Sequence, residues 1–281
     1  MSLPAQESRP GFEVSFSHAE FADADLDGGG ELGFRQTNFG IGADWSLGRG
    51  EALGLSLGVG LVDYDFSGNP AIIGSDAWGR VTELDLGMNW RRPVGESGML
   101  FIAPNLGVAR GEGADWGDSL RFGLIASYGV RVSRTLTFGI GAGIFTGLEE
   151  TSGFPVLLVN WQISESWRLG NSFNSGPSGP AGLELAYSFS PGWEVALGGG
   201  WRSDRFRLDE NGSNPNGIGE VEGVPVYLRL SWAAEDGLSL GVFGGLYASG
   251  EVTTETEGGF ELAEDDLDST PFFGISASLP F

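Results

Sequence analysis

Alternation of apolar with small or polar residues runs through almost the whole chain and limits the fold more than any other feature. In "LGLSLGVGL" (53–61), Leu and Val fill one set of alternate positions and Gly and Ser fill the other. The segment "LRFGLIASYGVRV" (120–132) has the same period. Successive side chains of a β-strand point to opposite faces, so these segments predict strands with one apolar face. Runs longer than about nine residues are typical of strands that cross a membrane.

Fourteen segments show this alternation. They are residues 12–21, 31–47, 51–66, 79–91, 98–110, 119–132, 135–147, 154–163, 167–175, 181–190, 193–207, 223–233, 238–250 and 271–281. Their connections alternate in length: "GRG" (48–50) and "PG" (191–192) are short, whereas "LDENGSNPNGIGEVE" (208–222) and "VTTETEGGFELAEDDLDS" (252–269) are long. Short turns at one end and long loops at the other are typical of outer-membrane barrels, and a soluble sandwich has no reason to sort its loops.

We therefore expect an all-β fold, a transmembrane antiparallel up-and-down β-barrel of about 14 strands, with 12 strands as the alternative. Short periplasmic turns and long extracellular loops would connect the strands. Residues 1–11 are expected to form an N-terminal extension and residues 12–281 a single barrel domain, because no change of composition divides the chain. The last strand should pair with the first, since a sheet in lipid cannot leave an open edge.

Tryptophan positions support two membrane interfaces. Six lie near short turns on the apolar face of their strands, namely Trp45, Trp90, Trp161, Trp167, Trp193 and Trp232. Trp201 shares the face of Trp193 eight residues away, which places the two about 20 Å apart along the membrane normal. Together with the terminal Phe281, these residues predict aromatic girdles at the membrane interfaces.

Composition narrows the function classes and the location. Acidic residues outnumber basic ones 38 to 15, and the net charge of −23 argues against a nucleic acid partner. The absence of cysteine excludes disulfides and thiol chemistry. No apolar run reaches the roughly 18 residues of a membrane helix. We expect a location in the bacterial outer membrane; because "MSLPAQESRP" shows no secretory signal, an exported protein would be present here in its mature or recombinant form.

Three stretches resemble an uncharacterised family of bacterial outer-membrane barrels, a domain of unknown function. They are "FPVLLVNWQISESWRL" (154–169), "GLELAYSFSPGWEVALGGGWRSDRFRLDENG" (182–212) and "DSTPFFGISASLPF" (268–281). The resemblance covers roughly residues 80–281 and implies a barrel without transferable catalytic residues. The terminal aromatic residue also resembles the signature read by the bacterial barrel-assembly machinery, although Pro280 removes one backbone donor.

If the aliphatic face meets lipid, the opposite face lines the lumen. The charged residues predicted to line the pore are Asp44, Glu83, Asp85, Arg91, Arg121, Arg131, Arg168, Glu184, Glu194, Arg202, Asp204 and Arg229. A lining of mixed sign suits a water-filled pore, although the same charges could instead pair across strands and brace the wall. Large inward residues such as Phe243, Tyr227 and Tyr247 are expected to form a small interior packing cluster.

The function predicted from these features is a passive, porin-like channel for small solutes. Its acidic extracellular loops, including "ELAEDDLD" (261–268), should make it weakly cation-preferring. The alternative is a non-conducting barrel whose acidic loops bind cations, lipopolysaccharide through bridging cations, or a protein partner. Expected partners are therefore outer-membrane lipid and lipopolysaccharide, the assembly machinery and small solutes. Oligomeric state stays open.

Two further motifs suggest specific chemistry. Asp23, Asp25 and Asp27, with Glu31 at the ninth position, match the first half of a calcium loop. Phe34 occupies the twelfth position, where a calcium loop has its bidentate Glu, so a solvated acidic loop is the other interpretation. No other cofactor is expected. His18 is the single histidine, and its lipid-facing side makes an outer-membrane lipid hydrolase the weakest alternative; no catalytic residues are assigned.

Overall fold

The structure, a computed structural model, describes residues 10–68, 70, 78–171 and 182–281. Most of the expected N-terminal extension, parts of two predicted connections, the end of the predicted strand 167–175 and the first residue of the predicted strand 181–190 lie outside the described residues. The strands are β1 (Gly11–Asp25), β2 (Glu31–Gly48), β3 (Glu51–Ser67), β4 (Arg80–Val94), β5 (Gly98–Gly111), β6 (Leu120–Arg131), β7 (Leu136–Gly147), β8 (Glu150–Gln162), β9 (Trp167–Asn171), β10 (Leu183–Ser190), β11 (Trp193–Gly199), β12 (Arg202–Arg207), β13 (Ile218–Ala233), β14 (Ser239–Glu255), β15 (Glu261–Leu267) and β16 (Thr270–Pro280).

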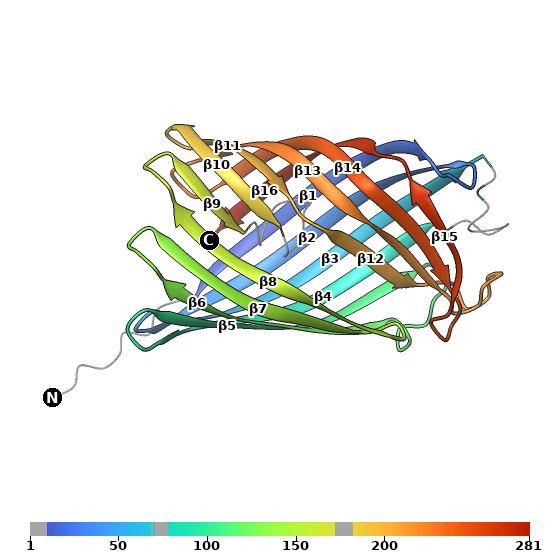
Figure 1. Cartoon of the computed structure of the whole chain (residues 1–281), viewed down its shortest axis with the longest axis horizontal. Coiled ribbons are helices and arrows are strands. Elements are labelled where there is room, and N and C mark those ends of the chain that lie inside the picture. The colour runs from blue at the N-terminus through green and yellow to red at the C-terminus, as the bar shows by residue number, and fades with distance from the viewer. Residues whose placement is uncertain (1–9, 69, 71–77, 172–181) are drawn as a thin grey trace.

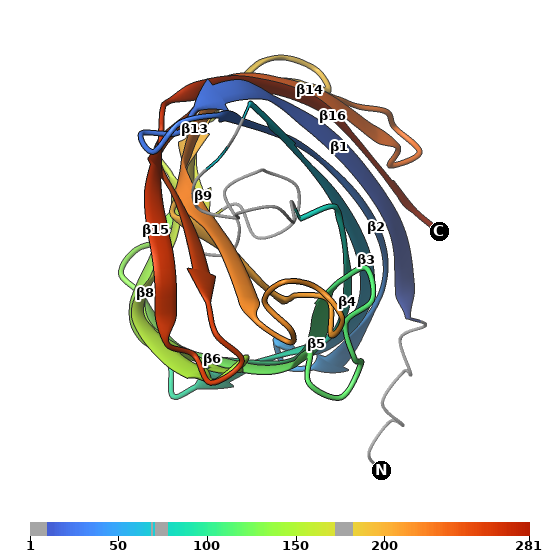
Figure 2. The same cartoon turned by 90° about the vertical axis from the view of Figure 1, so that its right-hand side faces the viewer.

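These strands form one closed antiparallel barrel (Figures 1 and 2). Its wall has 14 strands, because β11 and β12 pair with successive parts of β13, and β15 lies in the last long loop against β14. The predicted all-β barrel of 14 strands is thus confirmed. No described segment forms a helix with the length and apolar character needed to cross a membrane.

The chain ends close the barrel, as the terminal alternation predicts. β1 pairs with β16 from Glu13 opposite Pro280 to Phe21 opposite Phe272. The backbone N–H of Phe12 donates to the Phe281 carbonyl at 3.1 Å, and the Phe281 N–H donates back at 2.8 Å. Because this exchange satisfies the backbone groups beyond Pro280, the missing N–H of that proline is tolerated at the end of the ladder.

The two faces of the wall differ as the alternation predicts. Large apolar side chains are exposed on the outside, including Phe39, Leu57 and Leu86, each about half exposed. Near the short turns, Trp161, Trp167 and Trp193 are also exposed, and Phe281 stacks on Phe12 with ring centroids 5.6 Å apart. An apolar exterior bordered by aromatic residues is the surface that a barrel presents to lipid.

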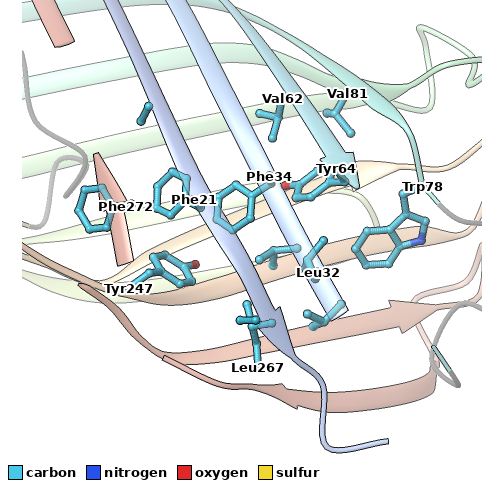
Figure 3. Packing of buried hydrophobic residues seen from close by; sticks show 14 of the residues in the cluster. Phe21, Leu32, Phe34, Val62, Tyr64, Trp78, Val81, Tyr247, Leu267 and Phe272 are labelled. Carbon is cyan, nitrogen blue, oxygen red and sulfur yellow. The ribbon is translucent and has the colours of Figure 1, made fainter. Parts of the chain in front are cut away.

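A buried aromatic cluster occupies the lumen toward the long loops (Figure 3). Phe21 stacks between Phe34 and Phe272, with ring centroids 4.1 and 4.8 Å away. Tyr247 meets Phe21 and Phe34 edge to face, and Tyr227 and Phe243 belong to the same cluster. The lumen is therefore packed on this side, and the interior cluster is larger than the sequence predicts.

One predicted strand is wrong in detail. The sequence pattern predicts one continuous strand over residues 193–207, but the strand is interrupted after Gly199, and β12 leaves the course of the wall. Gly198 and Gly199 end β11, and Gly200 lies in the interruption. Opposite Gly200 lies Pro225, whose carbonyl accepts the Gly200 N–H at 3.3 Å but whose ring nitrogen carries no hydrogen to donate back. A flexible segment facing a missing donor permits the bend.

Beyond the interruption, β12 crosses the lumen to the opposite wall (Figure 2). Arg207 pairs with Arg110 of β5, and Phe206 stacks on Tyr64 of β3 with ring centroids 5.4 Å apart. In the strand order, β6 to β11 lie between β5 and β13, the two wall strands that β12 joins. The crossing strand divides the part of the lumen that lies toward the long loops.

Candidate functional site: the lumenal cavity around β12

A cavity of about 1190 Å³ lies in the lumen around the crossing strand. Inward-pointing residues of the wall strands β1, β2 and β4 line it, among them Ser17, Asn38 and Asp85. The turn between β7 and β8 and the first part of β8 form another side. Consecutive residues of β12, Arg202 to Arg205, all line the cavity, so both faces of that strand border the same space.

Arg205 holds β12 in its crossing position. Its guanidinium pairs with Glu220 at 2.8 Å and with Glu255 at 2.6 Å, and all three side chains are largely buried. It also donates to the Leu148 carbonyl at 3.1 Å and lies 3.5 Å from Glu150. Arg205 thus joins β12 to β13, to β14 and to the turn between β7 and β8. Several charge-assisted bonds to one guanidinium fix its position more firmly than a single pair.

Most of the twelve charges predicted to line the pore form ion pairs. Arg121 lies 3.4 Å from Glu83, and Arg202 lies 2.6 Å from Asp204. A larger network contains Arg168, Glu194, Arg229 and Glu184. Four of the predicted residues border the cavity directly, namely Asp85, Arg121, Arg202 and Asp204. Asp44, Arg91 and Arg131 lie toward the short-turn ends of β2, β4 and β6.

The structure places Trp201 differently from the other predicted girdle residues. It lies in the interruption between β11 and β12, is half exposed and lines the cavity. Trp90, by contrast, donates its indole N–H to Glu51 at 2.9 Å beside a short turn. Six tryptophans are thus near the short turns, while Trp201 is beside the crossing strand.

Sequence reasoning missed the residues that fix β12, namely Arg205, Arg207, Glu150, Glu220 and Glu255. Arg205 has the opposite parity to Arg202 and Asp204, so a continuous wall strand would have pointed it toward lipid. Glu220 and Glu222 lie in what was interpreted as a loop, although β13 begins at Ile218. The one sequence signal for the bend was the run of three glycines before Trp201.

Glu222 lies at the acidic side of the cavity. It comes four residues before Val226, which is the strongly exposed apolar residue of β13 nearest to the long loops. It is thus outside the apolar band of the wall. Burial, followed by the nearby charges of Glu220, Glu251, Glu150 and Glu264, raises the pKa of Glu222 to about 7 from its ordinary 4.5. Glu251 is directly opposite Glu222 in the pairing of β13 with β14. The Arg205 guanidinium pairs with Glu220 and Glu255 rather than with Glu222.

We expect Glu222→Gln to raise the unfolding temperature at about pH 8 and to have little effect at about pH 4. Below pH 4.5 the carboxyl is protonated in both the folded and the unfolded chain. Between pH 4.5 and 7 the carboxyl is ionised in the unfolded chain but still protonated in the folded barrel, so the free energy of unfolding falls as pH rises. Above pH 7 this loss of stability is complete. Thermal unfolding in detergent across this range measures the effect. Glu235→Gln, the same charge change in a short turn, is the control; equal shifts for both variants would contradict the prediction.

The segment predicted to bind calcium forms a hairpin turn between β1 and β2. Asp23 and Asp25 belong to β1, Asp25 pairs with Glu31, and the turn is closed by the Leu26 N–H donating to the Gly30 carbonyl at 3.0 Å. Gly29 and Gly30 adopt positive φ angles of 101° and 85°. Within the described residues, no three acidic or histidine side chains are grouped as metal ligands. Calcium binding at this loop stays a prediction.

"ELAEDDLD" differs from the expected solvated loop. Most of it forms β15, and its alternate positions Asp265 and Leu267 are buried. The Asp265 carboxylate accepts the Gly28 N–H at 2.9 and 3.1 Å, so it ties the last long loop to the first. Glu261, Glu264, Asp266 and Asp268 are exposed. Four of the five acids are thus at the surface, whereas Asp265 is structural.

His18 is on the outer face of β1, where it contacts two groups that a hydrolase could use. Its Nδ1 is 2.8 Å from the Thr37 hydroxyl, and its Nε2 is 3.6 Å from Glu20. β1 is paired on both edges at this position, with Thr37 on one side and Ile275 on the other. Acyl transfer also needs donors for a developing oxyanion, and the ladders engage the local backbone N–H groups. Nothing in this geometry favours the hydrolase over a channel.

Comparison with known proteins identifies the fold of this chain but no family. No family model matches the chain. No curated protein matches it either. An outer membrane channel of Pseudomonas putida matches with a TM-score of 0.52 and 14% identity over 100% of this chain and 97% of that one.

Two further solved barrels match less well. A mutant of the TodX monoaromatic hydrocarbon channel has a TM-score of 0.43 and 10% identity over 99% of this chain and 91% of that one. LpxR of Salmonella typhimurium has a TM-score of 0.38 and 8% identity over 95% and 99%. The chain thus shares its fold with the Pseudomonas putida channel, a bacterial outer-membrane β-barrel.

Proposed function

We propose that this protein is an outer-membrane barrel that acts as a passive, weakly cation-preferring channel for small solutes. The observation that carries the proposal is the charged cavity inside a barrel with an apolar exterior. Side chains of both signs line it, with acids in excess: Asp85, Glu150, Asp204, Glu220 and Glu222 against Arg121, Arg202 and Arg205. A polar lumen in a lipid-facing barrel supports a path for hydrated solutes.

Cation preference would come from both the cavity and the acidic loops. A negative mouth concentrates cations and repels anions over about one Debye length, roughly 10 Å in 0.1 M salt and 3 Å in 1 M salt. The exposed acids of β15 and its flank lie at that mouth, since this strand belongs to the last long loop.

Reversal potentials across a KCl gradient in a planar bilayer test the proposal. We expect wild-type protein to conduct and to prefer cations. Replacing Glu261, Glu264, Asp266 and Asp268 by their amides should weaken this preference at about 0.1 M salt and change little at about 1 M, because salt screens the mouth. Asp265 is kept, because it holds the Gly28 N–H. A conducting wild type that prefers anions would contradict the role of the acids.

The aromatic cluster favours a second candidate, a non-conducting binding module. It fills the lumen toward the long loops between β1–β3, β14 and β16 (Figure 3). The acidic loops would then bind cations, lipopolysaccharide through bridging cations, or a protein. The same bilayer recording separates the two candidates, since a module gives no conductance when its insertion is verified.

The proposed orientation has its own test. Cysteines at Ser213 and Glu257, both in long loops, should react with an impermeant maleimide on intact cells. A cysteine at Arg49, in the short turn between β2 and β3, should react only after the outer membrane is permeabilised. Because the chain has no native cysteine, labelling reports only the introduced sites. Labelling of the Arg49 position alone on intact cells would reverse the orientation.

A further inference from the structure

Two arginines and one aspartate form a row on the outer face of the barrel, at the long-loop end of three neighbouring strands. Arg35 of β2 lies opposite Asp63 of β3, and Asp63 lies opposite Arg80 of β4. These strands run side by side in the wall (Figure 1). Arg35 has the parity of the exposed Phe39, and Asp63 has the parity of the exposed Leu57, so the row points away from the lumen. We call Arg35, Asp63 and Arg80 the arginine row.

Asp63 orients both guanidiniums and leaves most of their donors available. Its Oδ2 accepts from the Arg35 Nε at 3.1 Å, and its Oδ1 accepts from the Arg80 Nε at 2.7 Å. Among the described residues, no acceptor is bound to the terminal amino groups of either arginine. The Arg35 and Arg80 side chains are 59% and 57% exposed. Two guanidiniums and one carboxylate leave one net positive charge at the centre of the row.

The arginine row lies at the boundary of the apolar band. Arg35 is ten residues from Trp45, and Arg80 is ten residues from Trp90, in each case on the same face of one strand. For strands tilted by about 40°, ten residues correspond to about 25 Å along the membrane normal, which is the height of the band. Because the two tryptophans lie near short turns at one interface, the arginines lie at the opposite interface, at the level of the lipid headgroups.

A third arginine and a tryptophan border the row on the next strand. Arg110 of β5 pairs with Thr82 of β4 and has the parity of the exposed Leu106. Its guanidinium carbon lies 4.6 Å from the centroid of the Trp116 ring, and Trp116 is half exposed. The Arg110 Nε is buried and has no hydrogen-bond partner among the described residues. An indole face supports this guanidinium without neutralising its charge.

Acidic residues stand at both ends of the arginine row. Glu20 of β1 lies opposite Arg35, and the Glu112 N–H donates to the Arg80 carbonyl at 3.0 Å. These two acids offset the positive charge of the row, so the row does not attract anions from a distance. An anion held there must accept directly from the guanidinium N–H groups, whose planar fork matches a phosphate.

Below the row, the outer face offers a surface for acyl chains. Phe39, Leu57 and Leu86 lie between the row and the short turns on β2, β3 and β4, and each is about half exposed. Leu57 is directly opposite Leu86. A ligand that suits both parts carries a phosphate at the interface and several acyl chains in the hydrocarbon region, whereas free phosphate suits the first part alone.

We propose that the arginine row binds a phosphate group of lipopolysaccharide, the acylated glycolipid of the outer leaflet, directly and without a bridging cation. The phosphate oxygens accept from the terminal amino groups of Arg35 and Arg80, and the acyl chains lie along Phe39 and Leu57. Arg110 borders the phosphate on the β5 side. This inference uses the proposed orientation, which places the long-loop end in the outer leaflet, and it does not depend on conduction.

Native mass spectrometry of the detergent-solubilised barrel tests the proposal. The probes are lipid A with both of its phosphates, the same lipid A without phosphates, and phosphatidylglycerol, each titrated in excess EDTA. We expect phosphorylated lipid A to reach half-saturation at about tenfold or more lower concentration than either of the other lipids. EDTA removes divalent cations, so binding that persists in EDTA is direct.

Neutralising the arginine row should remove this preference. The triple variant Arg35→Gln, Asp63→Asn and Arg80→Gln leaves no member of the row charged and removes one net positive charge. We expect its preference for phosphorylated over dephosphorylated lipid A to fall to about threefold or less. Arg92→Gln is the control, because it makes the same net change on the same face of β4 beside a short turn, and it should keep the wild-type preference. Each preference is a ratio measured on one protein, so a lower yield of folded barrel does not produce the effect.

The outcomes separate this inference from the channel. Equal binding of the two forms of lipid A would overturn the phosphate site, and equal binding of phosphatidylglycerol would overturn the glycolipid class. Displacement of lipid A by inorganic phosphate alone would mean a site for free phosphate, and loss of binding in EDTA would mean bridging cations at the acidic loops. A reversed orientation in the cysteine labelling would remove lipopolysaccharide as the ligand. None of these measurements involves conductance, so the inference and the channel can fail independently.

Discussion

Leu57→Arg is expected to lower the free energy of unfolding of the barrel by about 2–4 kcal/mol. Leu57 is 51% exposed on the outer face of β3 and lies between the exposed Ile41 and Leu86 of the neighbouring strands. An arginine at this position must bring its charge into the hydrocarbon region, which is most costly near the middle of the bilayer. Reversible urea unfolding in lipid vesicles measures the loss.

Ser56→Arg is the matched control, since Ser56 is the preceding residue on the same strand and points into the lumen. A lumenal arginine remains hydrated, so we expect a loss of less than about 1 kcal/mol. Equal losses for the two variants would mean that the outer face does not contact lipid. A larger loss for Ser56→Arg would reverse the assignment of the two faces.

The architecture was predictable because each of its causes is local. Alternation along β3 assigns Leu57 outward and Ser56 inward without any other information, and repetition of this pattern leads to a barrel. Closure was predictable too, because the last strand ends on an aromatic residue of the correct parity, and Phe281 does pair with Phe12. These features depend on the residue spacing within single strands.

The course of β12 was not predictable, because it depends on contacts between distant segments. The pattern of 193–207 is compatible with a continuous wall strand, and the three glycines only permit a bend. Its direction is fixed by the packing of Phe206 against Tyr64 and by the Arg205 pairs with Glu220 and Glu255. Sequence separation between these partners is up to 142 positions, from Tyr64 to Phe206, so no local pattern contains the information.

The candidate site was half predictable for the same reason. Parity alone assigned Glu184 and Arg229 to the lumen, but it could not say whether they line an open path or neutralise each other. The structure pairs them at 2.8 Å. Asp265 was not predictable either. Its run of acids predicts a solvated loop, but the Asp265 carboxylate accepts the Gly28 N–H and joins two loops.

Arg229→Met is expected to destabilise the barrel by about 3–5 kcal/mol, the cost typical of leaving a buried charge without its partner. The Glu184 side chain is 5% exposed, and Arg229 donates to both of its carboxylate oxygens, at 2.8 and 3.1 Å. Without Arg229, the remaining donor to this carboxylate among the described residues is the Tyr227 hydroxyl, 2.9 Å away. Urea unfolding in vesicles again measures the loss.

A double-mutant cycle distinguishes the stranded charge from simple loss of packing. Glu184→Gln removes the charge and still accepts the Tyr227 hydrogen bond, so adding it to Arg229→Met should restore most of the lost stability. Arg168→Met is the exposed control: Arg168 is 38% exposed and lies 3.4 Å from Glu194, so its loss should cost less than about 1 kcal/mol. If the double variant is as unstable as Arg229→Met alone, the arginine acts through its packing, and these lumenal charges do not brace the wall as a pair.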